Sequence, residues 1–232
     1  MDHVVVDVEI ERTIEETPGG WDSTHLLGCA VACVWEYSTA RMRVYGPKDV
    51  DALRKRLLSA DRISGFNIWN FDYPVIWGFN KHDWMNWTTI NDNSRTHTGT
   101  DGANLKAELS TKTNDILRRI WQAKRLDPDK FDKRTHGGYS LDTIASATIG
   151  ASKIGNGADA PKWYQAGEIQ RVVNYCADDT CIERDLSDFI DKYGYVLHNG
   201  TKINLQPIRL ARRFGVHRIT IKRVLDGDNW NT

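Results

Sequence analysis

The sequence lacks any run of about 18 apolar residues, the length that a transmembrane helix requires. Its first residues, Met1-Asp2-His3, lack the basic start and apolar core of a secretory signal peptide. Cysteine is scarce, and none of the four cysteines belongs to a CxxC pair or a zinc-finger spacing. These absences argue against a membrane protein, a disulfide scaffold and a zinc finger. We therefore expect a soluble, cytoplasmic protein with reduced thiols and no membrane partner.

The chain also lacks a net charge: its 232 residues include 31 basic and 31 acidic ones, so the formal net charge is zero. The balance is uneven: residues 202–232 hold seven basic and two acidic residues, which leaves 24 basic and 29 acidic residues elsewhere. A basic tail on an acidic body indicates a local contact surface for nucleic acid, although a solvated helix face would give the same pattern.

The hydrophobic pattern predicts an α/β protein that begins with an antiparallel meander of three strands. The expected strands cover residues 4–10, 26–35, 41–45 and 62–67. The expected helices cover residues 47–59, 114–124, 140–150 and 168–190, the last with or without a break. A hairpin over residues 195–205 turns at Asn199-Gly200. Residues 80–111 are polar and predict an irregular insertion, either beside a substrate groove or as a surface loop anchored by tryptophans.

The first expected strand carries two acidic side chains in an otherwise apolar run, Val4-Val5-Val6-Asp7-Val8-Glu9-Ile10. Because side chains alternate along a strand, Asp7 and Glu9 project from the same face. Burying two neighbouring carboxylates is costly unless a cation faces them. The alternative is a strand end with two solvated acids, and this strand alone does not distinguish the two.

Two later motifs supply further carboxylates. Asp72 closes a segment, beginning at Asn67, that follows the fourth strand. Tyr175 and Asp179 are four residues apart, so a helix places them on one face. Helical phase places the neighbouring Asp178 toward solvent.

Two other acids have a more ordinary explanation. Asp115 and Asp142 lie near expected helix starts, where acids commonly cap backbone amides. Ser140 is the expected N-cap of the helix that contains Asp142, and we expect that helix to end near Gly150.

Taken in order, these motifs resemble the DEDD exonucleases of the DnaQ-like, RNase H-fold superfamily, in the tyrosine-containing (DEDDy) subtype. The first motif is similar to Asp7-Val8-Glu9, the second to Asn67 through Asp72, and the third to Tyr175-x-x-x-Asp179. Residues 60–67 and 139–145 resemble a phage-type subgroup. Asn174 stands where a sister subtype has a histidine. The resemblance implies an RNase H-like domain over residues 1–205, with a mixed central β-sheet flanked by helices.

The resemblance also implies two divalent ions, Mg²⁺ or Mn²⁺, which prefer oxygen ligands. Asp7 would bridge both ions, while Glu9 and Asp179 would complete the site of the ion that activates the attacking water. Asp72 would act on the second ion, directly or through water. Tyr175 would orient the attacking water.

The implied activity is 3′–5′ hydrolysis of DNA, preferably from single-stranded or frayed 3′ ends, with release of nucleoside 5′-monophosphates. Asn67 and Phe71 are the expected substrate-binding residues. An RNA-directed or structure-specific nuclease is one alternative. A non-catalytic DNA-binding protein with a nuclease-like scaffold is another. A polymerase or helicase would have to be a separate partner.

Residues 206–232 resemble a basic helix-turn-helix segment that would contact DNA. The alternative is a pair of helices docked on the nuclease body. The residues expected to meet phosphates or a groove are Arg212, Arg213, His217, Arg218, Thr220, Lys222 and Arg223.

Overall fold

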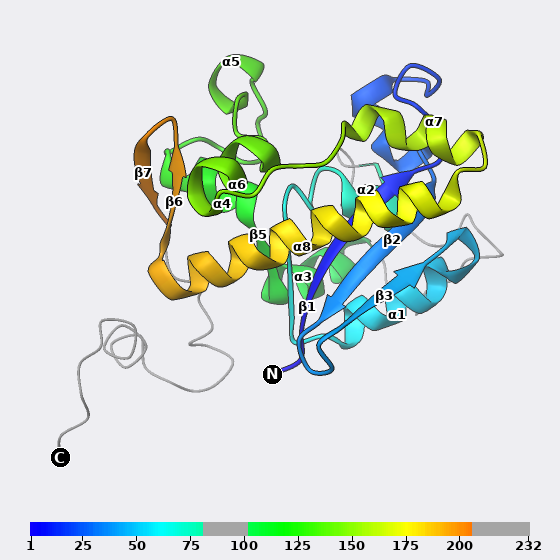
Figure 1. Ribbon diagram of the computed structural model, residues 1–232, viewed down its shortest axis with the longest axis horizontal. Coiled ribbons are helices and arrows are strands. Elements are labelled where there is room, and N and C mark those ends of the chain that lie inside the picture. Colours follow the sequence, from blue (N-terminus) through cyan, green and yellow to red (C-terminus); the bar gives the residue numbers. More distant parts are fainter. Residues whose placement is uncertain (81–101, 206–232) are drawn as a thin grey trace.

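A five-stranded mixed sheet forms the centre of the computed structural model, which describes residues 1–80 and 102–205 (Figure 1). The strand order is β3-β2-β1-β4-β5. The strands are β1 (His3–Ile10), β2 (Cys29–Glu36), β3 (Arg41–Tyr45), β4 (Arg62–Gly65) and β5 (Thr113–Asp115). The first three strands pair antiparallel, as predicted, whereas β4 and β5 run parallel to β1.

Helices cover both faces of this sheet. They are α1 (Val50–Ser59), α2 (Asp72–Trp77), α3 (Gly102–Lys112), α4 (Ile116–Ala123), α5 (Lys133–His136), α6 (Leu141–Ile149), α7 (Ala160–Gln165) and α8 (Ile169–Tyr193). Short 3-10 turns are η1 (Gly20–Leu26), η2 (Pro47–Asp49) and η5 (Gly157–Asp159). Helix α8 crosses one face and contacts β2, β1 and β4 (Figure 1). The predicted α/β class is confirmed.

The opposite face of β1 belongs to the main apolar core. Val4, Val6 and Val8 are buried there, in one cluster with Leu53 and Leu57 of α1. The alternation of β1 therefore directs its valines at even positions into this core and its odd positions toward α8. On the α8 side, Cys176 donates its thiol hydrogen to the carbonyl oxygen of Asp7 at 3.4 Å.

Part of the predicted irregular insertion is wrong, because α3 occupies residues 102–112. Leu105 and Leu109 are four residues apart and buried in the main core, so they share one helix face. Surrounding polar residues concealed this short apolar stripe. The remainder of the insertion, residues 81–101, lies outside the described residues.

The predicted helix over residues 114–124 is wrong at its start. Residues 113–115 form β5, which pairs with β4 through Ile63–Thr113, Ser64–Asn114 and Gly65–Asp115 before α4 begins. A three-residue strand is too short to show an alternating pattern, and its existence depends on β4 beside it. Helix α7 was not predicted, and α8 is continuous over 25 residues.

Other local predictions are confirmed. Ser140 caps α6 by accepting a hydrogen bond from the backbone N–H of Thr143, and Gly150 ends that helix in the left-handed region at φ 70°. The hairpin consists of β6 (Tyr195–His198) and β7 (Thr201–Asn204). None of the helices in the described part of the chain is long and apolar enough to cross a membrane. The predicted helix-turn-helix, residues 206–232, lies outside that part.

Candidate metal centre

Three carboxylates from two distant parts of the chain converge between β1 and α8. Asp7 and Glu9 come from alternate positions of β1, and Asp179 comes from the middle of α8. One oxygen atom from each lies within 4.8 Å of one from each of the others. The alternation of a strand and the packing of α8 across it thus gather acids that are about 170 residues apart in the chain.

Asp72 reaches the same region from the first turn of α2. Its Oδ1 accepts a hydrogen bond from the backbone N–H of Val8 at 3.2 Å, which fixes it beside β1. Its side chain is buried, and the charge of Asp7 raises its pKa further. The structure therefore brings together all four carboxylates that the sequence predicts, with Asp72 outside the tight group of three.

Burial and mutual repulsion raise the pKa values of the carboxyl groups in this cluster, which favours their protonated forms in the absence of a cation. Desolvation raises the pKa of Asp7 to about 7, and the negative charge of Asp179 adds to the shift. The same causes raise the pKa of Glu9 well above its usual value, with Asp7 as its strongest charged neighbour. A cation entering the cluster would remove this penalty and leave the acids ionised.

The donor set fits hard divalent cations. Within the described residues, the buried Oδ2 of Asp7 and Oδ1 of Asp179 have no hydrogen-bond partner. Buried polar atoms in folded proteins normally have a partner, and an absent ion is one accepted reason for an exception. Carboxylate oxygens are also the ligands that Mg²⁺ and Mn²⁺ prefer.

A lysine that the sequence analysis missed enters the cluster. Lys153 lies in the connection after α6, and its Nζ is 2.6 Å from Oδ2 of Asp179. Burial disfavours its charge, but Asp179 and Asp7 outweigh that effect and raise the pKa of Lys153 above its usual range. Its ammonium group is therefore a permanent positive charge at one edge of the site. A lysine in a polar loop gives no sequence signal of this position.

Tyr175 lies one helical turn before Asp179, as predicted. Its ring packs edge-on against Trp163 at 5.7 Å between centroids, and the Nζ of Lys153 lies 5.3 Å from its centroid. Its hydroxyl is buried and makes no hydrogen bond to any described residue. Desolvation raises the pKa of Tyr175 above its usual range, so the hydroxyl stays protonated near neutral pH.

The three other acids considered in the sequence do not belong to the group of three carboxylates. Asp115 caps α4 by accepting from the backbone N–H of Arg118 at 3.2 Å, which confirms the predicted capping role. Asp142 accepts from the backbone N–H of Lys153 at 2.9 Å and so anchors the loop that carries this lysine. Asp178 is partly buried rather than fully exposed.

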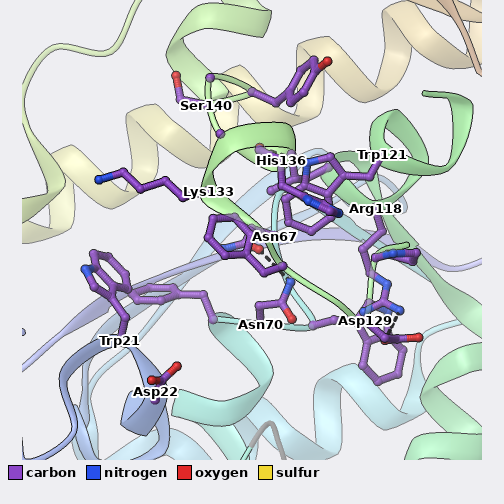
Figure 2. A pocket seen from close by; sticks show the side chains of 18 of the residues that line it. Trp21, Asp22, Asn67, Asn70, Arg118, Trp121, Asp129, Lys133, His136 and Ser140 are labelled. Atoms are coloured by element: carbon purple, nitrogen blue, oxygen red, sulfur yellow. Dashed lines mark hydrogen bonds and ion pairs between the residues drawn. The ribbon is translucent and has the colours of Figure 1, made fainter. Parts of the chain in front are cut away.

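A pocket of about 1030 Å³ adjoins the segment that leads to Asp72 (Figure 2). Phe71, the residue before Asp72, and Asn67 both line it, so the structure places both predicted substrate-binding residues on one wall. Figure 2 shows Asn67 and Asn70 near the middle of the pocket and Trp21 toward one end. The amide nitrogen of Asn70 donates to the side-chain oxygen of Asn67 at 3.2 Å.

Aromatic and basic side chains also line this pocket. Trp121 of α4 and His136 of α5 pack edge-on at 4.9 Å between centroids. Phe131 also lines the pocket and is 65% exposed, a large value for an apolar side chain. Lys133 adds a cation at the rim (Figure 2).

The wall that contains Asn67 is fixed by one carboxylate. Asp115 accepts hydrogen bonds from the backbone N–H groups of Asn67 and Trp69, both at 3.1 Å, in addition to its bond with α4. Asn67 adopts a left-handed backbone conformation at φ 67°, which asparagine tolerates better than most residues. These bonds hold the tight turn between β4 and α2.

Comparison with known proteins gives a fold and no family. No protein-family model matches the sequence, and no curated protein matches it either. Among solved structures, the chain is similar to the family B DNA polymerase from the hyperthermophilic archaeon Pyrobaculum calidifontis, with a TM-score of 0.50 and 14% identity. The match covers 82% of this chain but only 24% of the polymerase chain. It agrees with the α/β, RNase H-like architecture predicted from the sequence.

Proposed function

We propose that this protein is a two-metal-ion-dependent 3′–5′ exonuclease that hydrolyses phosphodiester bonds at single-stranded or frayed DNA ends. The observation that carries the proposal is the convergence of Asp7, Glu9 and Asp179 within 4.8 Å, with Asp72 held beside them. A set of buried acids with unpartnered oxygens destabilises a fold unless cations bind it. A protein that used this fold only as a scaffold for DNA binding would gain nothing from such a cluster.

The four carboxylates would hold two Mg²⁺ or Mn²⁺ ions, with Asp7 shared between them. When bound, such ions lower the pKa of the attacking water and neutralise charge during in-line displacement at phosphorus. Tyr175 is protonated at neutral pH and its hydroxyl has no partner in the described chain. It can therefore orient the water by hydrogen bonding rather than remove its proton. Lys153 pairs with Asp179 and would add positive charge near the scissile phosphate.

The aromatic and basic pocket supports an unpaired nucleic-acid strand as substrate. Bases of a single strand expose their flat faces, on which side chains such as Phe71 and Phe131 can stack. Lys133 can contact the phosphates of the same strand. A base-paired duplex offers no free base faces to these side chains.

The test is cleavage of a 5′-labelled single-stranded DNA by the full-length protein with Mg²⁺ or Mn²⁺. A ladder that shortens from the 3′ end, and that disappears with EDTA, is expected. An RNA of the same sequence and a blunt DNA duplex run in parallel would separate the substrate classes.

The absence of cleavage of all three substrates would overturn the proposal. Release of the label as a short 5′-terminal product, without a ladder, would instead indicate the opposite polarity. Calorimetric titration with Mn²⁺ provides an independent check, because a nuclease-like scaffold that only binds DNA should not bind two ions.

A further inference from the structure

A fifth buried acid lies one helical turn beyond Asp179. Glu183 of α8 is only 2% exposed, and its Oε2 has no hydrogen-bond partner among the described residues. Residues four apart lie on the same side of a helix, so Glu183 faces the sheet surface that Asp179 faces. The sequence motifs do not include this residue.

The same acids surround Glu183 and the metal-site carboxylates. After burial, the groups that most raise the pKa of Glu183 are the carboxylates of Asp7 and Asp72. For Glu9, the strongest neighbours are instead Asp7 and Asp179. Asp7 is thus the strongest charged neighbour of both glutamates, and Asp72 follows it for Glu183 whereas Asp179 follows it for Glu9.

The nearby cations are engaged with other acids. Arg62 of β4 pairs with Asp191, at 2.6 Å, and lies 3.5 Å from the hydroxyl of Ser187. Ser187 and Asp191 follow Glu183 along α8 at intervals of about one turn, so all three residues lie on the same side of the helix. Lys153 pairs with Asp179. The charge of Glu183 is consequently left without an ion-pair partner in the described part of the chain, and burying such a group is costly.

We propose that Glu183 is a fifth carboxylate of the metal centre, and that it holds the second divalent ion together with Asp7 and Asp72, directly or through water. This inference rests on the proposed two-metal function. The formal charges support it: two divalent ions and Lys153 carry five positive charges, which balance five carboxylates. Without Glu183 the metal-loaded site would carry one excess positive charge before substrate binds.

The experiment is a calorimetric titration of the full-length protein with Mn²⁺, comparing wild type with Glu183→Gln. Wild type should bind two ions. Glu183→Gln should keep one site unchanged and bind the other about tenfold or more weakly, as expected when a metal-supporting group is lost. Asp185→Asn is the matched control, since it removes one charge from a more exposed position of the same helix and should change neither affinity.

Each outcome has a defined meaning. If Glu183→Gln binds both ions with wild-type affinity, Glu183 is a neutral, structural glutamic acid and the inference is overturned. If wild type itself binds no Mn²⁺, the two-metal function fails as well. The unfolding temperature in EDTA shows whether the variant is folded. Glu183→Met, which keeps a similar length without polar oxygens, carries the same test if the glutamine variant does not fold.

Discussion

The two faces of β1 differ in chemistry although they share one eight-residue strand. On one face, Val4, Val6 and Val8 are buried in the apolar core beneath α1. On the other face, Asp7 and Glu9 meet Asp179 of α8, and the Oδ2 of Asp7 has no hydrogen-bond partner in the described part of the chain. The first face stabilises the fold, whereas the second destabilises it in the absence of cations. Neighbouring residues of one strand should therefore respond oppositely to substitution.

Asp7→Asn should have the largest effect on activity. Asparagine keeps the shape of the side chain but removes the charge that would be shared by both ions. We expect a loss of about 10³-fold or more in cleavage rate, corresponding to several kcal/mol of lost transition-state stabilisation. Cleavage of labelled DNA under single-turnover conditions measures it. Parent-like cleavage by the folded variant would contradict the site assignment.

In metal-free protein, the carboxylate face of β1 should make the free energy of unfolding depend on pH, whereas the valine face should not. The pKa of Asp7 is about 7 in the folded chain against an ordinary value of 3.8, so the folded state binds more protons between these pH values. Its contribution should therefore lower the free energy of unfolding as pH rises from about 4 to 7.

His3 acts in the opposite direction, because burial lowers its pKa to about 4. The measurement is therefore the difference between wild type and Asp7→Asn in urea unfolding with EDTA, in which His3 contributes equally to both. The free energy of unfolding of Asp7→Asn should therefore increase relative to that of wild type as pH rises from about 4 to 7. A difference that stays flat across the range would show that Asp7 is ionised throughout.

Tyr175→Phe should slow cleavage by about 10- to 100-fold without loss of stability. The hydroxyl has no hydrogen-bond partner in the described chain, so removing it breaks no hydrogen bond within that chain. Rate measurements and thermal unfolding together check this. Tyr164→Phe is the matched control, because that hydroxyl contacts Glu11 instead, at 3.5 Å. Equal rates for Tyr175→Phe and wild type would remove Tyr175 from the mechanism.

Val6→Ala tests the opposite face of the strand, one residue from Asp7. Loss of two buried methyl groups should lower the free energy of unfolding by about 2 kcal/mol. Mn²⁺ affinity should stay unchanged, because Val6 points into the core away from the carboxylates. Urea unfolding and calorimetry measure the two quantities. A loss of Mn²⁺ binding in a folded variant would show that the two faces are not independent.

Phe131→Ala should have the smallest effect. Its ring is mostly exposed, so stability should hardly change, whereas loss of one stacking surface should weaken binding of single-stranded DNA by about 1 kcal/mol. Fluorescence anisotropy measures this change. Tyr193→Ala, at another exposed aromatic ring, should leave DNA affinity unchanged. If both variants bind equally well, the pocket does not hold the strand.

The sequence predicted the parts of the site that follow a repeating local pattern. The alternation of β1 was sufficient to place Asp7 and Glu9 on one face, and helical spacing paired Tyr175 with Asp179. Their convergence followed from a resemblance to known motifs rather than from local pattern. The structure confirms that Asp7, Glu9 and Asp179 lie together.

Residues placed by tertiary packing alone could not be predicted. Lys153 is in a loop without periodicity, and the packing of that loop on Tyr175 together with its bond to Asp142 brings it to Asp179. Glu183 did offer a signal, because it lies four residues after Asp179 on the buried side of α8. Strand β5 offered none, since three residues are defined as a strand only by the neighbouring β4.

The bonds of Asp115 have a mechanical consequence. One carboxylate joins the start of α4 to the turn that carries Asn67, and that turn leads within five residues to Asp72. A nucleic-acid strand that contacts the α4 side of the pocket could therefore move the turn that leads to Asp72, which we propose as a metal ligand. Under the proposed function, substrate binding in the pocket and the position of Asp72 would be coupled through Asp115. If the proposed function holds, substitutions in α4 that widen the pocket should lower the cleavage rate before they lower the affinity for DNA.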